Sequence, residues 1–180
     1  MHSGRKTITI VEKITLKWSE IPKMLLNDFS GEYRFALDQK KRINIPAALR
    51  KMLSPEADGT LVFVRGFEGC VYVYPSDEWK RLTRRLNALD SFQVKIRDFI
   101  RLFVGSAYKT TMDNQGRVLL PDQVLEMAQI DKEILLLGSL NKWELWNPEK
   151  YDNYVKNNNL SMESLAQEIN FSAMFNSQDE

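Results

Sequence analysis

The sequence predicts a mainly β fold with short helices (α+β), in which two tandem repeats share one pseudo-twofold β-barrel and a helix follows each half. Residues 35–52, FALDQKKRINIPAALRKM, recur as residues 110–127, TTMDNQGRVLLPDQVLEM, with an acid, a base and a proline in step 75 positions apart. Apolar and polar residues alternate around both copies, which is typical of half-buried strands. A half of about 75 residues buries little surface alone, so the two halves are expected to interleave.

Each copy is predicted to run strand, turn, strand, short helix, strand, strand. Pro46 begins the short helix of the first copy, because proline is tolerated in the first helical turn. In the first copy the predicted strands are residues 29–37, 42–46, 60–66 and 70–75. In the second copy residues 122–130 form the helix, and residues 133–138 and 143–148 form the last two strands.

A helix is expected after each half. Two apolar stripes at helical spacing, both interpreted as core, comprise Trp79, Leu82, Leu86 and Leu89, then Phe92, Ile96, Phe99 and Phe103. The basic residues of the same segment are Arg81, Arg84 and Arg85. A solvated helix face is the preferred interpretation of these arginines, ahead of contact between subunits and contact with DNA.

The chain divides into four predicted parts. Residues 1–26 lie outside the repeat and are expected to be a poorly ordered extension. An added strand, a flexible basic arm, or translated upstream sequence with the true start at Met24 are the alternatives. Residues 27–103 form the first repeat with a helical hairpin, residues 104–156 the second repeat, and residues 157–180 an acidic tail.

Composition argues against several classes of function. His2 is the only histidine and Cys70 the only cysteine of the 180 residues, which argues against a histidine-based triad or metal site and leaves no intrachain disulfide. A reducing cytoplasm is therefore expected. No carboxylates pair with a base or nucleophile at motif spacing, so we expect no enzyme, catalytic residue, cofactor or small-molecule substrate. No apolar run approaches the ~20 residues that span a membrane.

Charge is distributed unevenly, although the formal net charge is only +1. Residues 29–53 carry six basic side chains against two acidic ones, and residues 80–101 carry seven against two. The segment from Lys156 onward carries one basic side chain against four acidic ones. A local basic patch matters more for nucleic-acid binding than the total charge.

The repeated turn carries the candidate site. Asp38 and Asp113 can accept hydrogen bonds from nearby backbone N–H groups and fix the bend, and Gly116 can adopt a positive φ. Arg42 and Arg117 would then be held outward on one face, where a guanidinium suits phosphate or a guanine edge and a β-ribbon suits the major groove. A plain surface ion pair, with a free energy of about 0.3–1 kcal/mol, is the equally open alternative.

The turn motifs DQKKRINIP and DNQGRVLLP, together with YPSDEWKRL, KIRDFIRLFVGSA and NKWELWNPEKY, resemble the MraZ family of bacterial regulators of the division and cell-wall gene cluster. The resemblance covers residues 29–154. It implies an AbrB-like swapped-hairpin barrel of two SpoVT-AbrB-like repeats and ring-shaped homo-oligomers. It also implies binding to direct repeats of double-stranded DNA in the cluster's own promoter, a cytoplasmic, nucleoid-associated location, and no catalysis.

Carried over by position, the resemblance implies that Lys40, Arg42 and Arg117 face DNA and that Asp38 and Asp113 structure the turns. The candidate DNA-binding residues also include Lys41, Arg50 and Gln115, and the turn-structuring residues also include Gly116. Lys41 stands where the family's first motif has glycine; a left-handed backbone there would cost lysine about 1–2 kcal/mol. The counterpart of Arg50 is Leu125, and Arg50 either reaches a phosphate or lies over the core.

A second function stays open from sequence. The protein could be a non-enzymatic oligomeric adaptor or nucleoid-associated protein without promoter specificity. Partners would then bind through aromatic strands such as residues 143–146, WELW.

Overall fold

The structure is a computed structural model that describes residues 29–171, so the predicted extension at residues 1–26 lies outside the described residues. In chain order the elements are β1 (Glu32–Ala36), β2 (Arg42–Asn44), α1 (Ala47–Lys51), the 3-10 helix η4 (Pro55–Ala57), β3 (Thr60–Arg65), β4 (Val71–Pro75), α2 (Ser76–Asn87), α3 (Val94–Val104), β5 (Tyr108–Thr111), β6 (Arg117–Leu119), α4 (Asp122–Ala128), β7 (Glu133–Ser139), β8 (Lys142–Trp146), α5 (Pro148–Asn157) and α6 (Met162–Glu168).

The strands of the two halves interleave in one antiparallel sheet. Its order is β1-β7-β8-β4-β3-β5, and β2 pairs with β6 in a separate two-stranded ribbon. Each half therefore gives an edge strand to the other: β1 pairs with β7, and β5 pairs with β3. If each of β1 to β4 is exchanged with its counterpart among β5 to β8, the strand order of the sheet is the same when read from the other edge. This correspondence indicates a pseudo-twofold axis. The predicted α+β swapped-hairpin barrel is confirmed.

One core fills the space between the six-stranded sheet and the β2–β6 ribbon. Its buried side chains come from both halves and include Ile43, Val118, Leu120, Phe63 and Trp143. Because the first and second copies contribute to the same cluster, neither half has a complete core of its own. This packing explains why a repeat of short strands can form a stable domain.

Backbone hydrogen bonds join the halves a second time, next to the ribbon. The N–H of Ile45 donates to the carbonyl of Gly116 at 2.9 Å, and the N–H of Leu120 donates to the carbonyl of Lys41 at 2.9 Å. The two bonds are equivalent under the repeat, because the donor Leu120 lies 75 residues after the donor Ile45, and the acceptor Gly116 lies 75 residues after the acceptor Lys41. The turn of each half is thereby attached to the strand end of the other.

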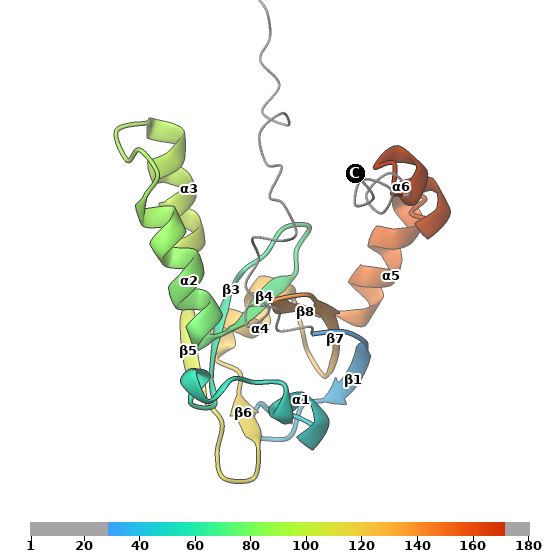
Figure 1. The fold of residues 1–180 in the computed structure, drawn as a ribbon. Helices are drawn as coiled ribbons and strands as arrows, with labels where there is room; N and C mark the ends of the chain where they lie inside the picture. Colours follow the sequence, from blue (N-terminus) through green and yellow to red (C-terminus); the bar gives the residue numbers. More distant parts are fainter. Residues whose placement is uncertain (1–28, 172–180) are drawn as a thin grey trace, which may run out of the picture.

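Two helical arms extend from the barrel, α2 with α3 and α5 with α6, and both point away from the end where β6 and α1 lie (Figure 1). The prediction of a helix after each half is confirmed. The interpretation of both stripes as core is wrong in part. Trp79 and Phe103 are buried, but Phe92 is 91% exposed, and Leu89 and Phe99 are also exposed. Phe92 precedes α3, and the arm meets the sheet only at its base.

The arginines of α2 do not share one environment. Arg84 and Arg85 are exposed, as expected of a solvated face. Arg81 is not: its guanidinium pairs with Glu78 and lies 3.7 Å from Glu56 and 3.8 Å from the buried Asp77. Arg81 therefore joins α2 to the connection that contains η4, and its interpretation as part of a solvated face is wrong.

No helix within residues 29–171 combines the length and apolarity needed to cross a bilayer.

Substitutions of two adjacent leucines, the last residue of β6 and the residue after it, can test which face of the ribbon is packed against the core. Leu120 is fully buried, whereas Leu119 is 49% exposed. We expect Leu120→Ala to lower the free energy of unfolding by about 2–5 kcal/mol, because it leaves a cavity in the shared core. The matched change Leu119→Ala is expected to stay within ~0.5 kcal/mol. Urea unfolding at one fixed protein concentration checks both; equal losses would contradict this orientation.

Candidate nucleic-acid interface

The first turn is built around the carboxylate of Asp38. Its Oδ1 accepts hydrogen bonds from the backbone N–H groups of Lys40 at 2.8 Å and Arg42 at 2.9 Å. Its Oδ2 accepts from Nε of Arg42 at 2.8 Å and lies 2.7 Å from Nη2. One oxygen therefore shapes the turn while the other holds the arginine side chain.

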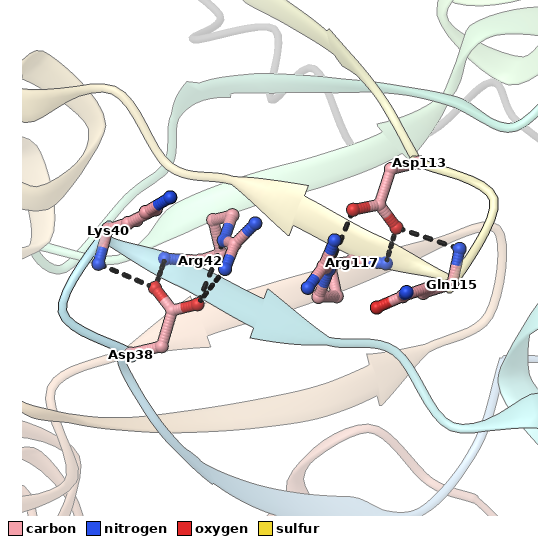
Figure 2. A network of polar contacts seen from close by, with 6 residues as sticks. All are labelled: Asp38, Lys40, Arg42, Asp113, Gln115 and Arg117. Carbon is pink, nitrogen blue, oxygen red and sulfur yellow. Dashed lines mark hydrogen bonds and ion pairs between the residues drawn. The ribbon is translucent and has the colours of Figure 1, made fainter.

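The second turn repeats this network 75 residues later. Oδ1 of Asp113 accepts from the backbone N–H groups of Gln115 and Arg117, each at 2.9 Å, and Oδ2 accepts from Nε of Arg117 at 2.7 Å. Figure 2 shows the two networks side by side on the β2–β6 ribbon, related by an approximate half-turn. Both aspartates thus occupy the turn-structuring position that the sequence assigned to them.

Both carboxylates are shifted toward the ionised form. The side-chain hydrogen bond from Arg42 is the main cause that lowers the pKa of Asp38 to about 2, with backbone N–H groups adding to it. The pKa of Asp113 is also lowered, and here the backbone N–H of Arg117 is the largest cause. Because both folded pKa values are depressed, ionisation stabilises each turn above about pH 3.8, the unfolded pKa. For Asp38 this stabilisation is lost as the pH falls through about 2, and for Asp113 it is lost in the same direction.

The register of the ribbon places both arginines on one face. Ile43 lies opposite Val118, Arg42 opposite Leu119, and Asn44 opposite Arg117. Directly opposed residues of an antiparallel pair project to the same side, and neighbours along a strand project to opposite sides. Since Ile43 and Val118 are buried, both arginines lie on the outer face. Their side chains are 25% and 34% exposed, so they are accessible but held against their aspartates.

The third position after each aspartate has a left-handed backbone in both turns. Lys41 has φ +56° and Gly116 has φ +78°. Glycine adopts this conformation without strain, whereas lysine does so at a cost of roughly 1–2 kcal/mol. The structure therefore shows why glycine suits this position and where Lys41 departs from it.

Each turn also contacts the short helix of the other half. The Lys41 ammonium pairs with Asp122 of α4, so part of its charge is already balanced. The Arg50 side chain of α1 lies over Gly116, where an added Cβ would stand only 2.7 Å from its Nε. Arg50 is exposed and lies beside the second turn rather than over the core.

The remaining candidates lie at the ends of the ribbon. Lys40 and Gln115 are exposed at equivalent positions of the two turns, and no side-chain hydrogen bond of theirs occurs within residues 29–171. Sequence reasoning missed Asn44 and Leu119, the two other exposed residues of the outer face. Strand alternation could have found them, because each stands two residues after an arginine.

Charge at the two turns is similar but arises differently. The first turn has Lys40, Lys41 and Arg42 near Asp38 and Asp122, and the second has Arg117 and Arg50 near Asp113. Each turn therefore has an excess of one basic group.

Residues 29–171 contain no group of three or more histidine, cysteine, aspartate or glutamate residues arranged to hold a metal ion.

The interleaved repeats and the paired turns define a swapped-hairpin β-barrel protein of the AbrB-like class. A family model described as "MraZ protein, putative antitoxin-like" matches residues 29–102 and 103–170. The chain belongs to the MraZ family, which confirms the resemblance found in the sequence.

Similar proteins include three that are each called "Transcriptional regulator MraZ". The protein of Natranaerobius thermophilus is 37% identical over 141 residues, covering 78% of this chain and 96% of the relative. The protein of Clostridium beijerinckii is 39% identical over 142 residues, with coverage of 79% and 96%. The protein of Clostridium acetobutylicum is 38% identical over 141 residues, with coverage of 78% and 96%.

The pKa values of Asp38 and Asp113 are lowered mainly by different hydrogen bonds, and substitutions can test this difference. We expect Arg42→Ala to raise the pKa of Asp38 from about 2 toward 3.8, because it removes the largest cause of the shift. Lys40→Ala is the matched control and should leave this pKa unchanged, since Lys40 contributes only a backbone N–H. Arg117→Ala should raise the pKa of Asp113 by less, since alanine keeps the dominant backbone donor.

Carbon-detected NMR titration of the two aspartate carboxyl groups between pH 1.5 and 6 measures these changes. A pKa of Asp38 that stayed at about 2 in Arg42→Ala would contradict the assigned cause.

Proposed function

We propose that this protein is a transcriptional regulator that binds double-stranded DNA with sequence specificity through the outer face of the β2–β6 ribbon. The observation that carries the proposal is the placement of Arg42 and Arg117 on that one face, each fixed by an aspartate that also shapes its turn. A two-stranded ribbon fits the major groove, which is about 12 Å wide. The names of the relatives support the regulatory role.

The chemistry of the turns suits this role. Nε of each arginine is engaged by its aspartate, and among the described residues Nη1 of Arg42 has no hydrogen-bond partner. A guanidinium held in this way loses less side-chain entropy on binding than a free one, which favours affinity. Lys40 and Gln115 would contact phosphates beside the groove. Lys41 and Arg50 would add positive potential while supporting the turns.

The proposal includes ring-shaped homo-oligomers on direct repeats in the protein's own promoter, upstream of the division and cell-wall gene cluster. One protomer offers few phosphate contacts, whereas linked protomers on successive repeats can gain about 100-fold in affinity or more. A cytoplasmic, nucleoid-associated location and the absence of a catalytic step belong to the same proposal.

The two arms support assembly through unlike surfaces. The arm of α2 and α3, residues 76–104, carries seven basic and four acidic side chains, whereas residues 148–168 of the other arm carry two basic and four acidic ones. Both arms expose apolar side chains, among them Phe92, Leu102 and Met162. Contact between one arm and the opposite arm of the next protomer is heterologous, and such contacts close into rings when the rotation permits.

The exposed apolar arms also favour the second candidate, an oligomeric adaptor or nucleoid-associated protein without promoter specificity. In that case the arms would be the functional surface. The predicted partner surface at residues 143–146 is wrong, because Trp143, Leu145 and Trp146 are buried in the protomer. The ribbon would then bind DNA, if at all, without preference. Oligomers that bind promoter and random DNA equally would favour this candidate.

The ribbon proposal is tested by removing its arginines. We expect Arg117→Ala and Arg42→Ala each to weaken promoter binding by about tenfold, because a bidentate contact contributes ~1–3 kcal/mol. Arg34→Ala, which removes the same charge from an exposed position of β1 outside the ribbon and both arms, is the matched control and should bind like the parent protein. Gel shifts at fixed salt, with sedimentation to verify the oligomer, provide the measurement. Unchanged binding by Arg117→Ala would remove that residue from the site.

The arm proposal is tested by polar substitutions of two exposed apolar side chains of the α2–α3 arm. We expect Phe92→Ser combined with Leu102→Ser to yield smaller species in sedimentation velocity, since both side chains are exposed in the protomer and belong to one arm. Affinity for a duplex with one repeat should persist, while the gain on several repeats, about 100-fold, should be lost. Leu140→Ser changes an equally exposed leucine outside the arms and should leave the oligomer intact.

A further inference from the structure

The outer face of the ribbon is symmetric in charge and asymmetric in its other side chains. Rotation about the pseudo-twofold axis, which passes between Ile43 and Val118, exchanges Arg42 with Arg117. The same rotation exchanges Asn44 with Leu119. The first pair is alike in chemistry, and the second joins an amide to a hydrocarbon.

The orientation of a symmetric face on DNA would be ambiguous. The two strands of a duplex are themselves related by twofold axes, which is why symmetric proteins select palindromic sites. If only Arg42 and Arg117 contacted bases, turning the protein by 180° would present the same groups to the same groove. Both orientations would then have equal affinity.

The unlike turns do not remove this ambiguity. Lys40 corresponds to Gln115, so the positive charge at this position of the first turn has no counterpart at the same position of the second. Phosphates follow the groove on both sides, however, and contacts with them carry no sequence information. A reversed protein would place Lys40 near an equivalent phosphate at the other edge of the site.

Asn44 and Leu119 differ in what they can contact. Asn44 is exposed, and its amide makes no side-chain hydrogen bond within residues 29–171. A free amide can donate to and accept from adenine in the major groove, whereas a leucine can make only apolar contact, as with a thymine methyl group. Each lies beside an arginine of the opposite strand, Asn44 beside Arg117 and Leu119 beside Arg42.

We propose that Asn44 and Leu119 determine the direction in which the protein lies on its DNA site, with Asn44 over a base pair that offers amide partners and Leu119 over an apolar base edge. This inference rests on the proposed binding of DNA by the ribbon. In the reversed orientation the amide would face the apolar edge and the leucine would face unpaired polar groups. Loss of one good bidentate contact lowers affinity by about tenfold or more.

A directional protomer requires a non-palindromic site. Protomers joined head to tail through unlike arms also share one direction along the assembly. The same asymmetry would therefore match direct repeats rather than inverted ones.

Affinity cleavage measures direction. Gln39 and Asn114 are equivalent, exposed positions in the two turns, and Gln39→Cys or Asn114→Cys can carry a chelated iron that cuts nearby DNA. Cys70, the only cysteine of the sequence, is 1% exposed and is expected to escape labelling. The full chain is bound to a duplex with one site, selected by the protein from random sequence. We expect Gln39→Cys to cut on one side of the site and Asn114→Cys on the other, each by at least about tenfold over the opposite side.

Two further variants test whether Asn44 and Leu119 determine the direction of binding. Exchanging the pair, with Asn44→Leu and Leu119→Asn together, is expected to move the Gln39→Cys cut to the opposite side. Asn44→Leu alone makes the pair alike and is expected to give cuts on both sides. Equal cutting on both sides by the unexchanged protein, or an unchanged side in these variants, would overturn the inference. Loss of all binding in Asn44→Leu would overturn it too, because Asn44 would then supply affinity rather than direction.

The proposed function fails in a different way. If the unexchanged protein retarded no selected DNA, both the ribbon proposal and this inference would fall. Retardation with cuts on both sides would overturn the direction alone.

Discussion

Antiparallel pairing of β2 with β6 is the constraint on which the candidate site depends. Ile43 and Val118 face each other across this pair and enter the shared core, so their neighbours in each strand must project outward. A shift of either strand by one residue would turn the arginine of that strand toward the core and expose its apolar residue. The hydrophobic effect therefore keeps the guanidinium groups on one face, although it acts on neither of them directly.

Within that constraint, one carboxylate in each turn has two tasks. Oδ1 of Asp38 satisfies two backbone donors of the turn, and Oδ2 holds Arg42; Asp113 acts in the same way on its own turn. Exposed ion pairs contribute little to stability, at most about 1 kcal/mol. The contribution of these pairs is therefore mainly positional, because a long flexible side chain becomes part of a fixed surface.

The two halves have diverged where their contacts cross. Lys41 accepts a strained backbone and pairs with Asp122 of the other half, while Gly116 is unstrained and leaves room for Arg50. Each route leaves one excess basic group near a turn, so similar electrostatics are reached by different residues. The helical arms diverged further, since one is basic and the other acidic. A pseudo-symmetric barrel thus carries features that can distinguish its two ends.

The sequence by itself determined the repeat, the order of strands and short helices within each copy, the turn positions of both aspartates and arginines, and the family. These features depend on neighbouring residues, on periodicity and on a motif written twice. Only the tertiary structure decided that Phe92 lies exposed, that Arg81 joins α2 to Glu56, that Arg50 lies over Gly116, and that Asn44 lies beside Arg117 and Leu119 beside Arg42. Those outcomes depend on how strands and helices pack against one another, and contacts between residues far apart in sequence leave no local pattern in the chain.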